Sequence, residues 1–323
     1  MPSLATHVPN LRRLEACDWS AFDTLFLGDP SCHLYPGNFA RYVDELAAGV
    51  EMVKAWGKRA ILSLYAVPRN DDLPWIRALL EGAIERRLPL DGVEIHNLGL
   101  LVILRELRNT WPVTIGVCGN LYTVATAQML GEYGVVDGFP NPEVGLPEVA
   151  ELVRDGGIGV ILQVHGKIPL GFSDKCFVVD YQKQEGTCEE VCFTDHWLTR
   201  DGWTLKNIGR VVLSGKDLCM IEHLPDLLEE GHRHFYIWTF AESPEYVAAI
   251  GGLYREALEE AFSGSADYRL RPEWEETIRR FAPAGLCNGF YFNTTGQSYV
   301  GALDGESTEG LRPAEHIPGR SRA

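Results

Sequence analysis

Three cysteines stand close together in one polar stretch of the sequence. Cys176, Cys188 and Cys192 follow a C-x11-C-x3-C spacing between His165 and His196. The stretch is too polar and too interrupted for a core helix, so we expect a long loop without regular structure. Loops of this length in compact domains usually carry function. Because thiolates are ligands for soft metal ions, the spacing predicts a metal-binding loop.

The elements that would position these thiols alternate regularly along the chain. Short apolar runs are followed by segments whose apolar residues recur at helical spacing. The runs predict strands at 22–27, 59–66, 92–95, 113–117, 135–139, 159–164, 209–213 and 235–239. The periodic segments predict helices at 38–56, 74–87, 98–108, 123–133, 146–154, 221–230 and 245–262. Continuous apolar strands indicate a parallel sheet that is covered on both faces.

Eight such units are the number that closes an α/β fold into a (β/α)8 TIM-type barrel. We expect the barrel to span residues 1–265, with a short C-terminal appendage at 266–301. Residues 302–323 are rich in Gly, Ser, Arg and Glu, and we expect a disordered tail there. An open doubly wound sheet is the alternative fold. No G-x-G-x-x-G follows the first predicted strand, so a dinucleotide-binding fold lacks its fingerprint.

The barrel brings a fourth thiol within reach of the other three. Cys32 lies five residues after the first predicted strand, and Cys176 follows the sixth. The loops after barrel strands all open on one face, so these cysteines can meet there. Four thiolates suit a tetrahedral zinc ion or an iron–sulfur cluster. The absence of a C-x2-C knuckle and the wider C-x3-C pair favour iron–sulfur, while a Cys3His zinc site that uses His196 stays open.

Polar residues at the ends of the predicted strands would line the same face. The candidates for catalysis are Arg69, His96, His165 and Lys216. Further strand-end or loop residues are Asn70, Asn97, Asn120, Asn141, Lys167 and Glu242. Arginine suits bidentate contact with a carboxylate, and a histidine can move protons near neutral pH. For each residue, a structural role such as loop capping is the alternative.

Composition limits the partners and the compartment of the chain. The 323 residues carry 29 basic and 45 acidic side chains, for a net charge of −16. This balance disfavours unaided binding to nucleic acid or to an anionic membrane. No apolar run is long enough to span a bilayer, and the N-terminus lacks a signal-peptide core. We therefore expect a cytoplasmic protein whose eight cysteines are thiols or metal ligands rather than disulfides.

Three segments resemble a known family. They are LGDPSC (Leu27–Cys32), HGKIPLGFSDKCF (His165–Phe177) continuing to TCEEVC (Thr187–Cys192), and LCNGFY (Leu286–Tyr291). Together they resemble the UbiU/UbiV-type family, often identified as collagenase-like peptidases of family U-32. The resemblance covers roughly residues 15–300 and is closest to UbiV, because Pro169 stands where UbiU-like members have a cysteine.

The resemblance implies that Cys32, Cys176, Cys188 and Cys192 hold a 4Fe–4S cluster. It also implies oxygen-independent hydroxylation in ubiquinone biosynthesis, with prephenate as the oxygen donor and a UbiU-like paralogue as heterodimer partner. Related members hydroxylate RNA bases, which gives an RNA-base hydroxylase as the alternative. The family label suggests a zinc-dependent hydrolase, although the chain has neither G-x-S-x-G nor H-E-x-x-H. Where the broader family has Ile-Glu-Gly-Arg, Ile237–Phe240 read Ile-Trp-Thr-Phe, which points to a different substrate.

Overall fold

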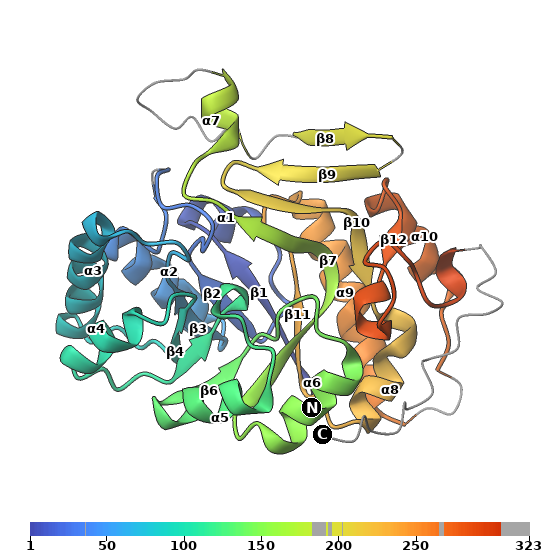
Figure 1. The fold of residues 1–323 in the computed structure, drawn as a ribbon, viewed down its shortest axis with the longest axis horizontal. Coiled ribbons are helices and arrows are strands. Elements are labelled where there is room, and N and C mark those ends of the chain that lie inside the picture. Colours follow the sequence, from blue (N-terminus) through green and yellow to red (C-terminus); the bar gives the residue numbers. More distant parts are fainter. Residues whose placement is uncertain (36, 183–191, 193–195, 202, 265–267, 305–323) are drawn as a thin grey trace, which may run out of the picture.

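Eight parallel strands close into a barrel, and helices cover its outside (Figure 1). The computed structural model describes residues 1–35, 37–182, 192, 196–201, 203–264 and 268–304. The barrel strands are β1 (Ser3–Val8), β2 (Thr24–Leu27), β3 (Arg59–Ser63), β4 (Gly92–Ile95), β5 (Val113–Ile115), β6 (Val135–Gly138), β7 (Gly159–Phe172) and β11 (His234–Ile237). Each pairs in parallel with the next, and β11 pairs with both β7 and β1. The predicted (β/α)8 barrel is therefore confirmed.

The predicted number of strands is right, but one predicted member is wrong and another was missed. The first strand is β1, at the very start of the chain, where Thr6 and His7 interrupt the apolar pattern. Thr6 is tolerated there because its hydroxyl donates to Ile237 O at 2.8 Å. The segment predicted at 209–213 belongs to β10 (Val211–Cys219), which runs antiparallel to β7 and is not a barrel strand.

Helices form the outer layer. They are α1 (Leu11–Ala16), α2 (Val43–Ala55), α3 (Leu73–Glu85), α4 (Leu100–Glu106), α5 (Val124–Glu132), α6 (Leu146–Asp155), α8 (Leu224–Glu229) and α9 (Pro244–Phe262). Side-chain caps set several of their starts. Thr123 accepts from Thr126 N ahead of α5, and Ser243 accepts from Tyr246 N ahead of α9. Such caps satisfy backbone donors that have no partner within the helix.

Side chains of the strands alternate between two apolar layers. Leu4 and Val8 of β1 point outward into the core between the strands and the helices, whereas Ala5 points into the barrel. The inner cluster includes Phe26, Ile61, Phe139 and Tyr236. Both faces of most strands are therefore buried over most of their length, which explains why they read as continuous apolar runs.

The carboxyl half of β7 leaves the barrel and starts an antiparallel arm. β7 pairs with β11 up to His165, and from His165 to Phe172 it pairs with β10. The arm continues with β9 (Trp203–Ile208) and β8 (Trp197–Arg200), and α7 (Phe177–Gln182) lies beside it at the top of Figure 1. Because β7 is parallel to every other barrel strand, the arm extends from the end where the barrel strands have their carboxyl termini.

The expectation of a loop without regular structure from His165 to His196 is therefore wrong for its first part. Residues 165–172 are strand, because β10 offers their backbone an antiparallel partner that the sequence pattern does not reveal. The short helix α7 follows Cys176 directly. Residues 183–191 and 193–195, including Cys188, lie outside the described residues.

The C-terminal segment packs against the arm. It comprises α10 (Pro272–Phe281), β12 (Leu286–Cys287) and the 3-10 turns Gly289–Phe292 and Ala302–Asp304. β12 pairs in parallel with β10, and Leu303 is fully buried, so the first residues of the predicted tail belong to the fold. The rest of that tail, residues 305–323, lies outside the described residues. Among the described helices, none is long and apolar enough to cross a membrane.

We expect the packing of β1 to be essential for the stability of the barrel. Leu4 is 0% exposed in the outer core, so Leu4→Ala leaves a cavity and should lower the free energy of unfolding by about 2–5 kcal/mol. Urea denaturation measures the change. Leu98→Ala is the matched control, because Leu98 is 43% exposed and should change stability by less than about 0.5 kcal/mol. Equal effects of the two substitutions would contradict the assignment of β1 to the barrel.

Candidate functional site

Two of the predicted cysteines meet at the turn between β9 and β10. Gly209 occupies this turn with φ +60°. A Cβ atom added to Gly209 would lie 3.3 Å from Cys176 Sγ and 3.6 Å from Cys192 Sγ. The two sulfurs therefore converge on the space that a side chain at position 209 would take. Cys192 is buried and Cys176 is half-buried.

Backbone hydrogen bonds fix Cys176 against this turn. Phe177 N donates to Gly209 O at 2.9 Å, and Ser173 N donates to Arg210 O at 2.8 Å. The thiol of Cys176 also accepts from Val179 N at 3.5 Å. The segment around Cys176 is thus held by the arm, which gives its sulfur a defined direction.

Cys32 lies on the loop after β2, at the same end of the barrel. Its sulfur accepts from Leu34 N at 3.5 Å, and its carbonyl accepts from Asn38 Nδ2 at 2.6 Å. Burial raises the pKa of Tyr35 well above its usual value, and the charges of Asp29, Cys32 and Cys192 raise it further. Thiols from distant parts of the sequence, Cys32 and Cys192, thus both act on the pKa of one phenol.

A buried arginine that the sequence did not reveal accompanies these thiols. Arg210 follows Gly209, donates to Tyr65 Oη at 2.6 Å and lies 3.7 Å from Asp174. Cys32 is among the charges that act on its guanidinium. Assigning 209–213 to a barrel strand hid this role, because it placed Arg210 away from the cysteines. Its positive charge would partly compensate the negative charge of a thiolate at Cys32.

The residues at this position suit a thiolate-bound metal group. Sulfur donors are soft ligands, which zinc and iron–sulfur clusters prefer. The glycine leaves room beside two of the sulfurs, and Cys192 belongs to the same buried apolar cluster as Val178, Ile208 and Val211. His196, the alternative zinc ligand, is half-buried ahead of β8 and its carbonyl accepts from Asn207 N at 2.8 Å.

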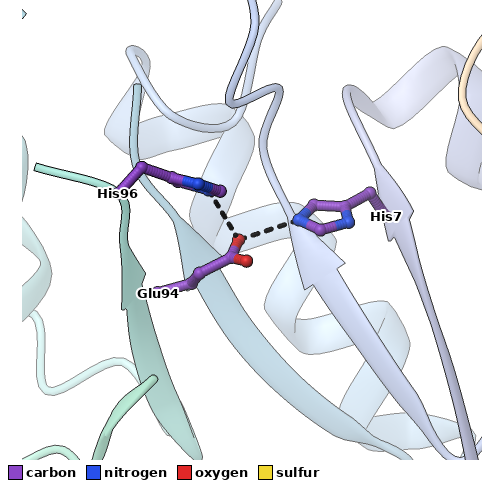
Figure 2. A group of neighbouring side chains, drawn as sticks. All are labelled: His7, Glu94 and His96. Carbon is purple, nitrogen blue, oxygen red and sulfur yellow. Dashed lines mark hydrogen bonds and ion pairs between the residues drawn. The ribbon is translucent and has the colours of Figure 1, made fainter. Parts of the chain in front are cut away.

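A second polar group lies inside the barrel itself (Figure 2). Glu94 on β4 faces His7 on β1 and His96 just after β4, with Oε2 2.8 Å from His7 Nε2 and 3.3 Å from His96 Nε2. All three side chains are buried. The sequence singled out His96 alone, because β1 was not recognised. A charged Glu94 in an otherwise apolar strand was the signal that could have found the group.

Glu94 and His96 each favour the charged form of the other. Burial alone would raise the pKa of Glu94, but the charges of His7 and His96 more than offset this and hold it below its usual value. Burial opposes the charged form of His96, but Glu94 and the neighbouring Cys118 thiol raise its pKa to about 10. The ionised form of Glu94 is therefore favoured, and its negative charge faces both imidazoles.

A small cavity opens beside this group. It holds about 30 Å³ and is lined by His7, Glu94 and His96 together with Gln163 and Asn288. Asn288 comes from the LCNGFY segment, which reaches back over the barrel. A cavity of this volume admits roughly two water molecules, so with the side chains in these positions it has room only for an ion or a very small molecule.

Other polar residues that were predicted to line the site have structural partners. His165 Nδ1 lies 3.1 Å from Tyr254 Oη in the core, away from the lining of this cavity. Lys167 is buried and pairs with Asp217 at 2.5 Å. Arg69 pairs with Asp174 at 3.4 Å and stays largely exposed.

The remaining polar candidates lie in turns or make hydrogen bonds and ion pairs with other parts of the chain. Lys216 Nζ donates to Gln297 O at 2.9 Å, and Glu242 pairs with Lys206 at 3.2 Å. Asn97 and Asn141 accept from backbone groups two residues ahead of them. Asn120 takes the left-handed conformation that ends a 3-10 turn, and Asn70 lies in the 3-10 turn before α3. Of the four residues proposed for catalysis, His96 lines the cavity and the other three do not.

The fold and the site define a (β/α)8 barrel with several cysteine thiols at its mouth, the end where the barrel strands have their carboxyl termini. The chain belongs to peptidase family U32, whose family model matches residues 10–300. The predicted resemblance to this family is therefore confirmed.

Relatives of the chain carry different descriptions. An uncharacterized protease of Methanocaldococcus jannaschii is 26% identical and aligns with 81% of this chain and 65% of its own length. The tRNA hydroxylation protein P1 of Bacillus subtilis is 21% identical, over 91% of this chain and 72% of its own. The tRNA hydroxylation protein P2 of the same organism is 23% identical, over 80% and 87%. The chain thus spans less than two thirds of the archaeal relative's length.

We expect His165 to make the protein less stable in acid. Burial, helped by the charge of Lys167, lowers the pKa of His165 to about 3. The unfolded chain takes up this proton near its ordinary pKa of about 6.5, while the folded chain does not. The free energy of unfolding therefore falls between about pH 6.5 and pH 3, by up to about 1.4 kcal/mol per pH unit.

Urea denaturation across this pH range measures the slope. His165→Gln and His165→Phe remove the titrating ring in two different ways, so both should reduce the slope by the same amount even though their absolute stabilities differ. A slope unchanged from wild type in both variants would show that His165 is protonated in the folded protein.

Proposed function

We propose that this chain is an iron–sulfur protein that acts in oxygen-independent hydroxylation. Cys32, Cys176, Cys188 and Cys192 would hold a 4Fe–4S cluster. The observation that carries the proposal is the convergence of the Cys176 and Cys192 sulfurs on Gly209. Two relatives of the same family are named for tRNA hydroxylation, which supports hydroxylation as the reaction class.

The chain's own residues would serve such a cluster in defined ways. The cluster, when bound, supplies one-electron chemistry at the barrel mouth. Arg210 offsets the negative charge of the thiolates from a buried position. Val178, Ile208 and Val211 keep water away from the Cys192 side, which strengthens these electrostatic interactions. Tyr35 and Tyr65 bring neutral phenols to the Cys32 side.

For the substrate we propose an aromatic isoprenoid-quinone precursor, as in ubiquinone-type biosynthesis, with prephenate as the oxygen donor. The net charge of −16 opposes unaided binding of RNA and favours a small substrate. Prephenate carries two carboxylates and needs cationic partners. Lys167 is buried and paired with Asp217, whereas Arg69, although it pairs with Asp174, is exposed enough to contact a ligand at the mouth.

A tRNA base is the second candidate substrate, favoured by the names of the two Bacillus relatives. That one organism holds two such relatives also supports a paired assembly, so we propose a UbiU-like paralogue as the heterodimer partner. A partner could supply the basic surface that this chain lacks. A zinc-dependent hydrolase, as the family name suggests, is the alternative if the thiols bind zinc.

We expect anaerobic reconstitution to load about four iron and four sulfide ions per chain and to give broad absorbance near 400 nm. Cys188→Ser and Cys192→Ser should each abolish this absorbance, because each removes one thiolate ligand. Cys17→Ser is the matched control, since Cys17 follows α1 and is not among the four proposed ligands, and it should load iron as wild type does. One zinc per chain, with no iron under anaerobic handling, would refute the cluster and favour the hydrolase.

Anaerobic cells that lack this chain should accumulate unhydroxylated quinone precursors while their tRNA hydroxylation stays normal. Mass spectrometry of the quinone pool and of tRNA nucleosides from the same cells measures both. The Cys192→Ser variant should fail to restore the quinones, and Cys17→Ser should restore them. Loss of hydroxylated tRNA nucleosides with normal quinones would instead identify a tRNA base as the substrate.

A further inference from the structure

We propose that His7, Glu94 and His96 form a binding site for a divalent transition-metal ion inside the barrel, separate from the thiols. The candidate ligand atoms of these residues all lie within 4.8 Å of one another. Two imidazoles and one carboxylate are a recurring ligand set for zinc and for mononuclear iron(II). The three come from two strands on different parts of the barrel wall, and Figure 2 shows them turned toward a common point.

Two of the three separations among these atoms match those expected around a shared ion, and the third is at most 4.8 Å. Metal–ligand bonds of about 2.0–2.2 Å place neighbouring donors roughly 2.8–3.5 Å apart. Glu94 Oε2 lies 2.8 Å from His7 Nε2 and 3.3 Å from His96 Nε2. The distances from the carboxylate oxygen to the two imidazole nitrogens therefore match those between neighbouring ligand atoms of one ion.

Residues behind the three donors hold them in place, as is usual around bound metals. His7 Nδ1 lies 2.8 Å from Tyr236 Oη, which leaves Nε2 to face the site. Ser63 Oγ donates to Glu94 Oε2. The ring of His96 lies flush against Gly116, where an added Cβ would come within 2.1–2.6 Å of three ring atoms. Glycine at position 116 therefore allows His96 to reach the site.

Buried polar atoms in this group lack well-aligned hydrogen bonds. Glu94 Oε1 has no hydrogen-bond partner within the described part of the chain, and the His96 ring, 1% exposed, has the Glu94 carboxylate at 3.3 Å and the Cys118 thiol as its polar neighbours there. Buried polar groups without partners cost free energy, so the three side chains without a bound ion do not explain why these polar atoms are buried. An ion would satisfy them, and the adjacent cavity of about 30 Å³ leaves room for one or two waters on its open side.

Manganese(II) is a suitable probe, because it prefers oxygen and nitrogen donors and avoids the thiols. Titrating the full chain with Mn²⁺ should reduce the six-line EPR signal of the free ion until one equivalent is bound. Pulsed EPR of the bound ion should show couplings to imidazole nitrogen. Cys176→Ser should bind Mn²⁺ as wild type does, so this result is independent of the fate of the iron–sulfur proposal.

Glu94→Gln and His96→Gln should each weaken Mn²⁺ binding by more than about tenfold. His223→Gln is the control, since His223 contacts Val300 O away from the barrel interior, and it should leave the affinity unchanged. Circular dichroism verifies that each variant is folded. If a variant does not fold, the imidazole couplings of the wild-type complex decide alone. No binding by wild type, binding without imidazole couplings, or equal binding by folded Glu94→Gln and His96→Gln would overturn the proposal.

Discussion

Closure of the parallel sheet is the constraint on which the rest of the structure depends. β1 fills the gap between β11 and β2, so the barrel has no unpaired edge. Closure also sets where chemistry can occur, because it gathers the carboxyl ends of eight strands at one rim. The loop of Cys32 leaves that rim from β2, and the arm of Cys176 leaves it from β7. His7 faces Glu94 across the interior for the same reason.

The thiol group and the His7–Glu94–His96 group share one apolar interior. The inner cluster runs from Phe26 and Tyr236, whose rings flank His7, to Cys192 beside Gly209. Polar atoms at both ends are therefore removed from water by the same packing. In such surroundings charges interact strongly, and every buried polar atom needs a partner. A substitution that loosens this cluster should disturb both groups together.

The sequence allowed the barrel and the family to be predicted, and the meeting of Cys176 with Cys192 agrees with the expected thiol cluster, while the place of Cys32 in that cluster stays a prediction. These features depend on local patterns, such as apolar runs, helical spacing and cysteine positions. It did not allow β1 to be recognised, because Thr6 and His7 break its pattern and their partners lie far along the chain. The antiparallel pairing of β7 with β10 was also missed, because the sequence pattern does not reveal which strand pairs with which. Arg210, His7 and Glu94 then went unnoticed, since their roles appear only when those strands are placed.

The pairing of β1 with β11 has a consequence for the order of events during synthesis. Ser3 and His234 are neighbours in the sheet but lie 231 positions apart in the sequence. A ribosome that adds about 5–20 residues per second needs on the order of ten to fifty seconds between them. Cys32, Cys176 and Cys192 all emerge within that interval. Their thiols therefore meet the cell's oxidants and metal ions in a nascent chain whose barrel cannot yet close.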